Sequence, residues 1–265
     1  MHKISRNSFY DENIKRIDVL DNRFYFDKEN PKIFYPSVTT ILEAYPKGWA
    51  LTQWHKSLGF NADIILQRAA IQGTNIHDAA NKYVNGHPLE FGTMVDGKFV
   101  ANYTFDEWEM ICKFVEFWTE FKPTLIASEV TILSEHHKLG GTIDLIVQMP
   151  NSKGVWETWI IDTKSGNALY PSHELQVAAY ATMWNEHNPD YFISRAGILH
   201  LNSLTRTKGK NGAIQGPGWQ IKEYDRHYAD AFKVFKHLRA VWDNENPTYE
   251  PKNYSLPGSF QLNVA

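Results

Sequence analysis

The sequence predicts an α/β or α+β fold, in which a mixed central sheet is flanked by helices and the N-terminal part adds a helical elaboration. Helix-like segments come first, three strand-like segments follow, and helices then alternate with two further strands. The chain has no internal repeat and no low-complexity linker, which indicates one domain. We expect residues 1–104 to hold the elaboration, residues 105–245 the core, and residues 246–265 a C-terminal tail.

The first half of the chain is expected to be mainly helical. The stretch RFYFDKENPKIFYPSVTTIL alternates aromatic residues across a turn with proline, and it predicts a hairpin leading into a short helix from Ser37. WALTQWHKSL and ADIILQRAAIQGTNIHDAANKYVNG predict two helices, the second ending at Gly86. A longer helix is expected at about 105–121, where apolar residues recur at helical spacing.

The second half predicts the sheet. Strands are expected at 125–133, 141–148 and 155–163. PSHELQVAAYATMWNEH then predicts a helix with Ser172 as its N-cap and Glu174 in its first turn. FISRAGILHLN and GWQIKEY predict two more strands, and DRHYADAFKVFKHLRAVWDNE predicts a closing amphipathic helix.

Composition limits the class of protein. Hydrophobic residues make up 43% of the chain and charged residues 22%, as in globular proteins. No apolar run approaches the ~20 residues that span a bilayer, and the N-terminal segment lacks the apolar core of a signal peptide. We therefore expect an intracellular, cytoplasmic protein of bacterial or phage origin without a membrane partner. The lone Cys112, in EMICKFVEFW, predicts a small buried residue and excludes a disulfide or Cys-ligated metal centre within one chain.

A formal net charge of −3 excludes a surface that is basic all over. Any binding of nucleic acid must therefore use a local basic segment. LTRTKGKNG, with Lys208 and Lys210, is the candidate for such a segment.

Three charged residues interrupt two apolar strands in the segment from Gly140 to Gly166. Strand alternation places Asp162 and Lys164 on one face, with Cα atoms ~6.6 Å apart. Asp144 lies beside Asp162 if the two strands form a hairpin. Buried carboxylates that repel each other require a cation, and Lys164 supplies one positive charge against two negative charges. Oxygen ligands without thiolates then favour Mg²⁺ or Mn²⁺, while a structural Asp–Lys ion pair remains the alternative.

Three further positions complete the candidate site, each with an ordinary structural alternative. Glu129, on the preceding strand, is a candidate for a second metal or a bridging water, or else a solvated edge residue. His77 lies at the margin of an apolar helical face, where it is either a metal ligand or an ordinary histidine at the boundary of the core. Gln176 and Tyr180 share one face of the helix after the Asp–Lys strand, where they suit hydrogen bonds to phosphates or to the lysine, or simply form part of the core.

The motifs GTNIH, GGTIDLI, IDTKSG and QVAAY together resemble, in order and spacing, those of RecB-type nucleases in the PD-(D/E)XK superfamily. YPSVTTIL is similar to the entry segment of phage and mitochondrial genome-maintenance exonucleases of this group, so the resemblance spans about residues 35–181. It implies a restriction-endonuclease-like fold. Some relatives hold an iron–sulfur cluster with four cysteines, and a chain with one cysteine departs from them.

The resemblance also implies roles for the candidate residues. A Mg²⁺ or Mn²⁺ ion would be held by His77, Asp144, Asp162 and the main-chain carbonyl of Thr163. Lys164 would orient the attacking water and help to deprotonate it, and Glu129 would contact the metal or its water. Gln176 and Tyr180 would position the catalytic loop and the DNA backbone.

The function expected from the sequence is that of a metal-dependent DNA nuclease, an exonuclease acting on DNA with a free end in replication, recombination or repair. The N-terminal helices, with Trp49, Trp54, Lys47 and Lys56, would form an arch over a threaded single strand, or else their tryptophans are ordinary core residues. One alternative is a catalytically silent nuclease-fold module that binds nucleic acid or a partner protein. Another is a glycosidase with a carboxylate pair, to which the nine tryptophans are suited.

Overall fold

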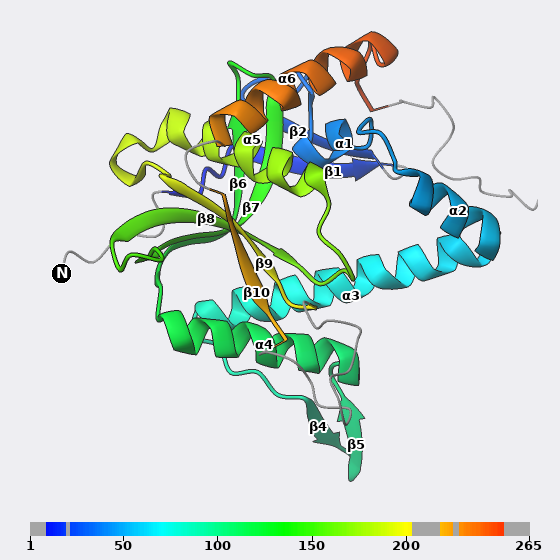
Figure 1. Ribbon diagram of the computed structural model, residues 1–265, viewed down its shortest axis with the longest axis vertical. Helices are drawn as coiled ribbons and strands as arrows, with labels where there is room; N and C mark the ends of the chain where they lie inside the picture. Colours follow the sequence, from blue (N-terminus) through cyan, green and yellow to red (C-terminus); the bar gives the residue numbers. More distant parts are fainter. Residues whose placement is uncertain (1–8, 20–21, 203–217, 225–227, 252–265) are drawn as a thin grey trace, which may run out of the picture.

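The protein is represented by a computed structural model that describes residues 9–19, 22–202, 218–224 and 228–251. Its centre is a five-stranded mixed sheet with the strand order β10-β9-β8-β7-β6. The predicted α/β architecture with a mixed sheet flanked by helices is confirmed (Figure 1). The strands of this sheet are β6 (Thr124–Ser134), β7 (Leu139–Pro150), β8 (Trp156–Lys164), β9 (Arg195–His200) and β10 (Gln220–Tyr224).

The central sheet combines antiparallel and parallel pairs. β6, β7 and β8 form an antiparallel meander, in which Leu145 pairs with Ile161. β8 and β9 run parallel and are connected through α5 (Pro171–His187) and a 3-10 turn, η2 (Pro189–Tyr191). This crossover begins directly after Lys164, so the end of β8 and the start of α5 lie at one end of the sheet.

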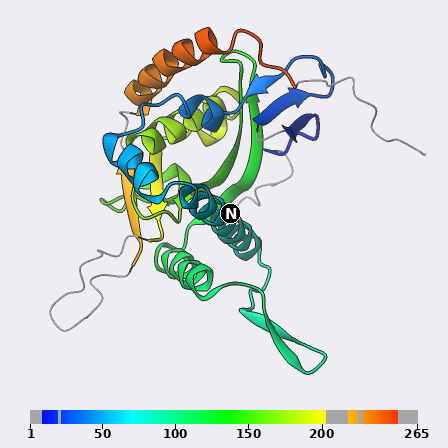
Figure 2. The ribbon, with the colours of Figure 1, turned by 90° about the vertical axis from the view of Figure 1, so that its right-hand side faces the viewer.

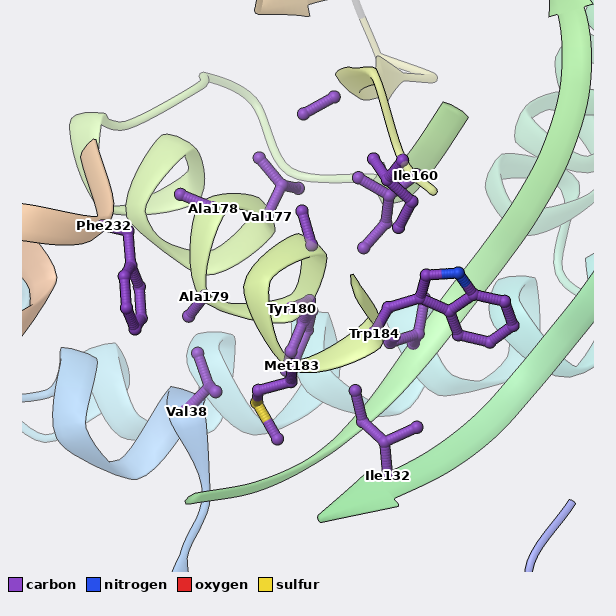
Figure 3. Close-up of a cluster of buried hydrophobic side chains, with 14 of the residues drawn as sticks. Val38, Ile132, Ile160, Val177, Ala178, Ala179, Tyr180, Met183, Trp184 and Phe232 are labelled. Atoms are coloured by element: carbon purple, nitrogen blue, oxygen red, sulfur yellow. The ribbon is translucent and has the colours of Figure 1, made fainter. Parts of the chain in front are cut away.

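Helices cover both faces of the sheet (Figures 1 and 2). α5 packs on one face together with α1 (Val38–Leu42) and α6 (Tyr228–Glu245). Figure 3 shows side chains of α5, among them Met183 and Trp184, in one apolar cluster with Ile132 of β6 and Ile160 of β8. α3 (Asn61–Val84) and α4 (Phe105–Phe121) enclose the second core cluster on the other face.

The N-terminal elements form a second, smaller sheet and a helical segment. The elements of this part are β1 (Ile14–Val19), β2 (Asn22–Asp27), β3 (Tyr35–Pro36) and α2 (Trp49–Leu58). The predicted hairpin is confirmed, because β2 and β3 pair antiparallel. The short helix after Ser37 is confirmed as well, and Ser37 Oγ accepts a hydrogen bond of 2.9 Å from the amide of Thr40 at the start of α1. α2 leads into the N-terminal end of α3 at one side of the molecule (Figure 1).

Several predictions about local structure are wrong. The N-cap of α5 is Tyr170 rather than Ser172, because Pro171 occupies the first helical position, where its missing amide hydrogen has no consequence. Cys112 is exposed on α4 instead of buried. The sequence reading also missed β1 and a hairpin formed by β4 (Gly92–Val95) and β5 (Lys98–Ala101) between α3 and α4.

Candidate active site

Asp162 and Lys164 lie at the end of β8, and the strand directs both side chains to the same side. Lys164 Nζ is 2.8 Å from Asp162 Oδ2, and Asp162 is only 2% exposed. The hairpin expected between β7 and β8 exists, and Asp144 Oδ2 accepts a 2.7 Å hydrogen bond from the amide of Thr163. The structure thus brings both aspartates and the lysine to one place, as strand alternation predicts.

α3 brings His77 to the same place from the other side of the sheet. Its Nε2 lies 3.0 Å from the carbonyl oxygen of Thr163, and its Nδ1 lies 3.3 Å from Asp144 Oδ2. A Cβ atom on Gly73, one turn earlier, would lie 3.6 Å from Ser165 Oγ, so the helix runs close to the chain that follows β8. This close approach places the imidazole over the end of the strand.

Glu129 of β6 also lies at the site, and its backbone is unusual. Its φ of 49° lies in the left-handed region, which a non-glycine residue adopts at a cost of about 1–2 kcal/mol. In β6 its neighbours Ser128 and Val130 still pair with Leu145 and Ile143 of β7. Its Oε1 lies 3.7 Å from His77 Nδ1. Backbone strain of this kind often accompanies a functional position.

Gln176 connects Asp162 and Lys164. Its Nε2 donates a 2.8 Å hydrogen bond to Asp162 Oδ1, and its Oε1 accepts a 3.1 Å hydrogen bond from Lys164 Nζ. Tyr180, one turn later, is 4% exposed and packs on β7, where a Cβ on Gly141 would come within 2.3 Å of its ring. Glycine at position 141 therefore leaves the space that the tyrosine needs.

Two histidines that the sequence analysis did not single out lie near Lys164. His200, on β9, pairs in register with Lys164, and its Nε2 lies 2.7 Å from the carbonyl oxygen of Gly166. His173 lies in the first turn of α5, where its Nδ1 accepts a 3.3 Å hydrogen bond from the amide of Tyr170. Burial, followed by the charges of Lys164 and His200, lowers the pKa of His173 to about 4. Only the parallel register of β8 and β9 could have revealed His200.

The electrostatics of the site reflect burial of several charges together. Burial raises the pKa of Asp162 to about 6, and the neighbouring Asp144 adds to this rise while Lys164 opposes it. Burial disfavours the charged form of His77, but Asp144 and Glu129 outweigh it and raise the pKa of the imidazole well above its usual value. The pKa of Asp144 is lowered, because His77 and Lys164 overcome the effect of burial. The cluster therefore holds two carboxylates whose pKa values are separated by their surroundings.

Several residues of the site have the chemistry of a hard-cation site. His77, Glu129 and Asp144 offer ligand atoms that all lie within 4.8 Å of one another. Asp162 lies outside this group and faces Lys164 and Gln176. Although Lys164 Nζ is 2.8 Å from Asp162 Oδ2, this buried oxygen has no partner with hydrogen-bond geometry among the described residues. The carboxylate oxygens and the Thr163 carbonyl suit Mn²⁺ or Mg²⁺, so these oxygen donors fit such an ion.

A cavity of about 790 Å³ adjoins the site. Trp54 of α2, Leu66 of α3 and Glu109 of α4 line it, and Ser165 and Tyr170 close it beside the end of β8. Trp49, by contrast, is 77% exposed and does not line this cavity. Lys47 and Lys56 are exposed. Lys208 and Lys210 lie outside the described residues.

A mixed sheet that presents an Asp-x-Lys strand, a second aspartate and a helical histidine at one end defines a nuclease domain of the restriction-endonuclease type. A family model for the PD-(D/E)XK nuclease superfamily matches residues 53–255. The chain therefore belongs to the PD-(D/E)XK nuclease superfamily, and the resemblance in the four motifs is confirmed.

Comparison with solved structures gives distant similarities. The alkaline exonuclease LHK-Exo of Laribacter hongkongensis is 7% identical, with 80% of this chain and 89% of that chain covered and a TM-score of 0.38. An exonuclease candidate from Eubacterium rectale is 14% identical, with 74% and 77% covered and a TM-score of 0.37. Comparison with curated proteins finds no match. Among the described helices, none has the length and apolar character needed to cross a membrane.

Proposed function

We propose that the chain is a metal-dependent DNA nuclease, and specifically an exonuclease that hydrolyses phosphodiester bonds of DNA with a free end in replication, recombination or repair. The observation that carries this proposal is the convergence of Asp144, Asp162, Lys164 and His77 at the end of β8 in a chain of the PD-(D/E)XK superfamily. A purely structural ion pair would explain Asp162 and Lys164. It would not explain a second carboxylate and an imidazole in the same place.

A Mg²⁺ or Mn²⁺ ion would be held by His77, Asp144, Asp162 and the main-chain carbonyl of Thr163, with Glu129 contacting the ion or its water. When bound, such an ion supplies a water that is nucleophilic near neutral pH and a counter-charge for the phosphate. The Asp162 Oδ2 atom, which has an ion pair with Lys164 but no partner of hydrogen-bond geometry among the described residues, and the close group of His77, Glu129 and Asp144 support this assignment.

Lys164 and Gln176 perform separate tasks in this proposal. The Lys164 side chain is 23% exposed, and Asp162 and Asp144 outweigh the effect of burial and raise its pKa, so its ammonium stays charged beside the reacting phosphate. There it orients the attacking water and stabilises the hydroxide that forms. Gln176 fixes the direction of both Asp162 and Lys164 through its two hydrogen bonds. Tyr180 is buried, packs on β7 one turn after Gln176, and acts as a positioning residue.

The cavity between α2, α3 and α4 supports entry of an unpaired strand. It begins at Ser165, next to Lys164, and its walls include the Trp54 and Tyr170 rings, on which bases stack. The α4 wall carries Asp106 and Glu109 together with Lys113, whose ammonium lies 2.9 Å from Glu109 Oε1, so charges of both signs lie along this wall.

A catalytically silent module is the alternative with the most support after the nuclease. It would keep the fold without the reaction, but then two buried carboxylates would persist at a cost of several kcal/mol without a function. The experiment that decides is incubation of end-labelled linear DNA and of circular DNA with Mg²⁺, Mn²⁺ or EDTA. Cleavage of linear DNA alone, lost in EDTA, supports an exonuclease. Cleavage of circles indicates an endonuclease, and no cleavage of either refutes the proposed activity.

A further inference from the structure

The β4–β5 hairpin extends away from the body of the protein on the side of α3 and α4 (Figures 1 and 2). Its two strands pair in register across the two-residue turn at Asp96 and Gly97, both of which have positive φ angles of 50° and 74°. This geometry is that of a tight hairpin turn of type I′. In the described part of the chain, the strands β4 and β5 pair only with each other.

One face of this hairpin is apolar and exposed. Met94 and Phe99 are cross-strand partners, so they share this face, and they are 67% and 57% exposed. The Phe99 ring is held in place, because it lies over Gly92, where a Cβ would come within 2.4 Å of it, and 6.0 Å from the ring of Phe91. Phe91 also contacts Phe105, which is 81% exposed at the start of α4. The surface formed by Met94, Phe99 and Phe105 is called the hairpin patch below.

The hairpin patch carries no charge of its own. The charged residues of the hairpin are Asp96, at the turn, and Lys98, which pairs with Val95 and so points to the opposite face. A surface without cations does not suit a nucleic-acid backbone. A second identical surface, however, can approach it without like-charge repulsion and without burying an unpaired charge.

The size of the patch is adequate for self-association. Aromatic side chains carry about 150–250 Å² each, so the exposed parts of Phe99 and Phe105 amount to roughly 200–350 Å². The exposed Met94 raises the apolar total of the hairpin patch to roughly 300–480 Å², while Val95 and Val100 lie on the opposite face and do not contribute. Interfaces are about 60% apolar, so a contact built on this patch would bury roughly 500–800 Å² per partner, a range whose upper end reaches the ~800 Å² of a standard stable complex.

We propose that the hairpin patch is the interface of a two-fold symmetric homodimer, in which Met94 and Phe99 of one copy pack against the same residues of the other. A two-stranded hairpin with both faces in water has marginal stability, and packing against its copy supplies the apolar cover that the monomer lacks. This inference is independent of the nuclease activity, because none of these residues belongs to the candidate active site.

Sedimentation velocity over a range of protein concentrations tests the proposal. The wild-type protein is expected to form a dimer, and Phe99→Ser should raise the dimer dissociation constant at least ~100-fold, because each substitution occurs twice across the two-fold axis and a buried aromatic contributes at least tenfold. Val234→Ser, which removes an exposed apolar side chain from α6 at the other end of the molecule, should leave the dissociation constant unchanged.

A cross-linking experiment tests the geometry. In a Cys112→Ser background, Met94→Cys should give a disulfide-linked dimer on mild oxidation, whereas Thr93→Cys on the opposite hairpin face should not. A wild-type protein that is monomeric at every soluble concentration overturns the proposal. A Phe99→Ser variant that keeps the wild-type dimer also overturns it. A Phe99→Ser variant that keeps the dimer but loses DNA binding would assign the hairpin to nucleic acid instead.

Discussion

Replacing Gln176 with leucine removes both hydrogen bonds that connect α5 to the candidate catalytic pair. The variant lacks the Nε2 group, which donates to Asp162 Oδ1 at 2.8 Å. It also lacks the Oε1 atom, which accepts from Lys164 Nζ at 3.1 Å. Hydrogen bonds to charged groups contribute about 1.5–3 kcal/mol, and 1.36 kcal/mol corresponds to one pKa unit. Loss of the donor therefore raises the pKa of Asp162 further above its value of about 6.

The consequence is a pH-dependent loss of metal affinity, because a protonated Asp162 cannot bind a cation. Relative to wild type, the Gln176→Leu variant should bind Mn²⁺ roughly two- to tenfold more weakly at pH 7. The difference should grow to roughly 10–100-fold near pH 5 and disappear above pH 9. Isothermal titration calorimetry with Mn²⁺ across this pH range measures the effect.

Thr182→Val on the same helix serves as the matched control. It removes a hydroxyl whose hydrogen bond is to the carbonyl of Ala178 within α5. Its Mn²⁺ affinity should follow the wild-type curve at every pH. A Gln176→Leu variant whose affinity is reduced by the same factor at all pH values would refute the reasoning, since Gln176 would then not act through the proton of Asp162.

Three further predictions follow from the same geometry. Lys164→Met should reduce DNA cleavage by at least ~10³-fold while Mn²⁺ affinity is kept or increased, since the ammonium is not a ligand; calorimetry showing lost metal binding would contradict this. Mn²⁺ at 100 times its Kd should add about 2.7 kcal/mol to the free energy of unfolding, as measured by thermal denaturation, and EDTA should reverse this gain. His77→Ala or Asp144→Asn should abolish the gain. In the metal-free protein, the raised pKa of Asp162 means that the folded state binds more protons than the unfolded state between about pH 4 and 6. The free energy of unfolding contributed by Asp162 should therefore fall as pH rises through that window, and urea denaturation of Asp162→Asn should show no such contribution.

The sequence predicted the core of the fold well because its elements have regular patterns. The helix expected at 105–121 coincides with α4, whose apolar positions recur at helical spacing. Strand alternation was sufficient to place Asp162 and Lys164 on one face, and the β7–β8 pairing brought Asp144 beside them. Local periodicity thus determines both the elements and the pair at the centre of the site.

Features that depend on tertiary contacts were not predictable in the same way. The left-handed backbone of Glu129 and the double hydrogen bond of Gln176 arise from the way β6, β8 and α5 pack, and no local pattern encodes them. The β4–β5 hairpin did have a local signal, the Asp96-Gly97 dipeptide between short apolar runs, which is typical of a two-residue hairpin turn. The exposure of Cys112 follows from the orientation of α4, which its apolar neighbours alone do not determine.

The position of a bound Mn²⁺ ion tests the central claim most directly. Anomalous diffraction from crystals grown with Mn²⁺ should show an ion in contact with His77, Asp144, Asp162 and the main-chain carbonyl of Thr163, with Lys164 beside it but not bound to it. No anomalous peak at the end of β8, or an ion that leaves Asp162 paired only with Lys164 and Gln176, would contradict the proposed metal centre.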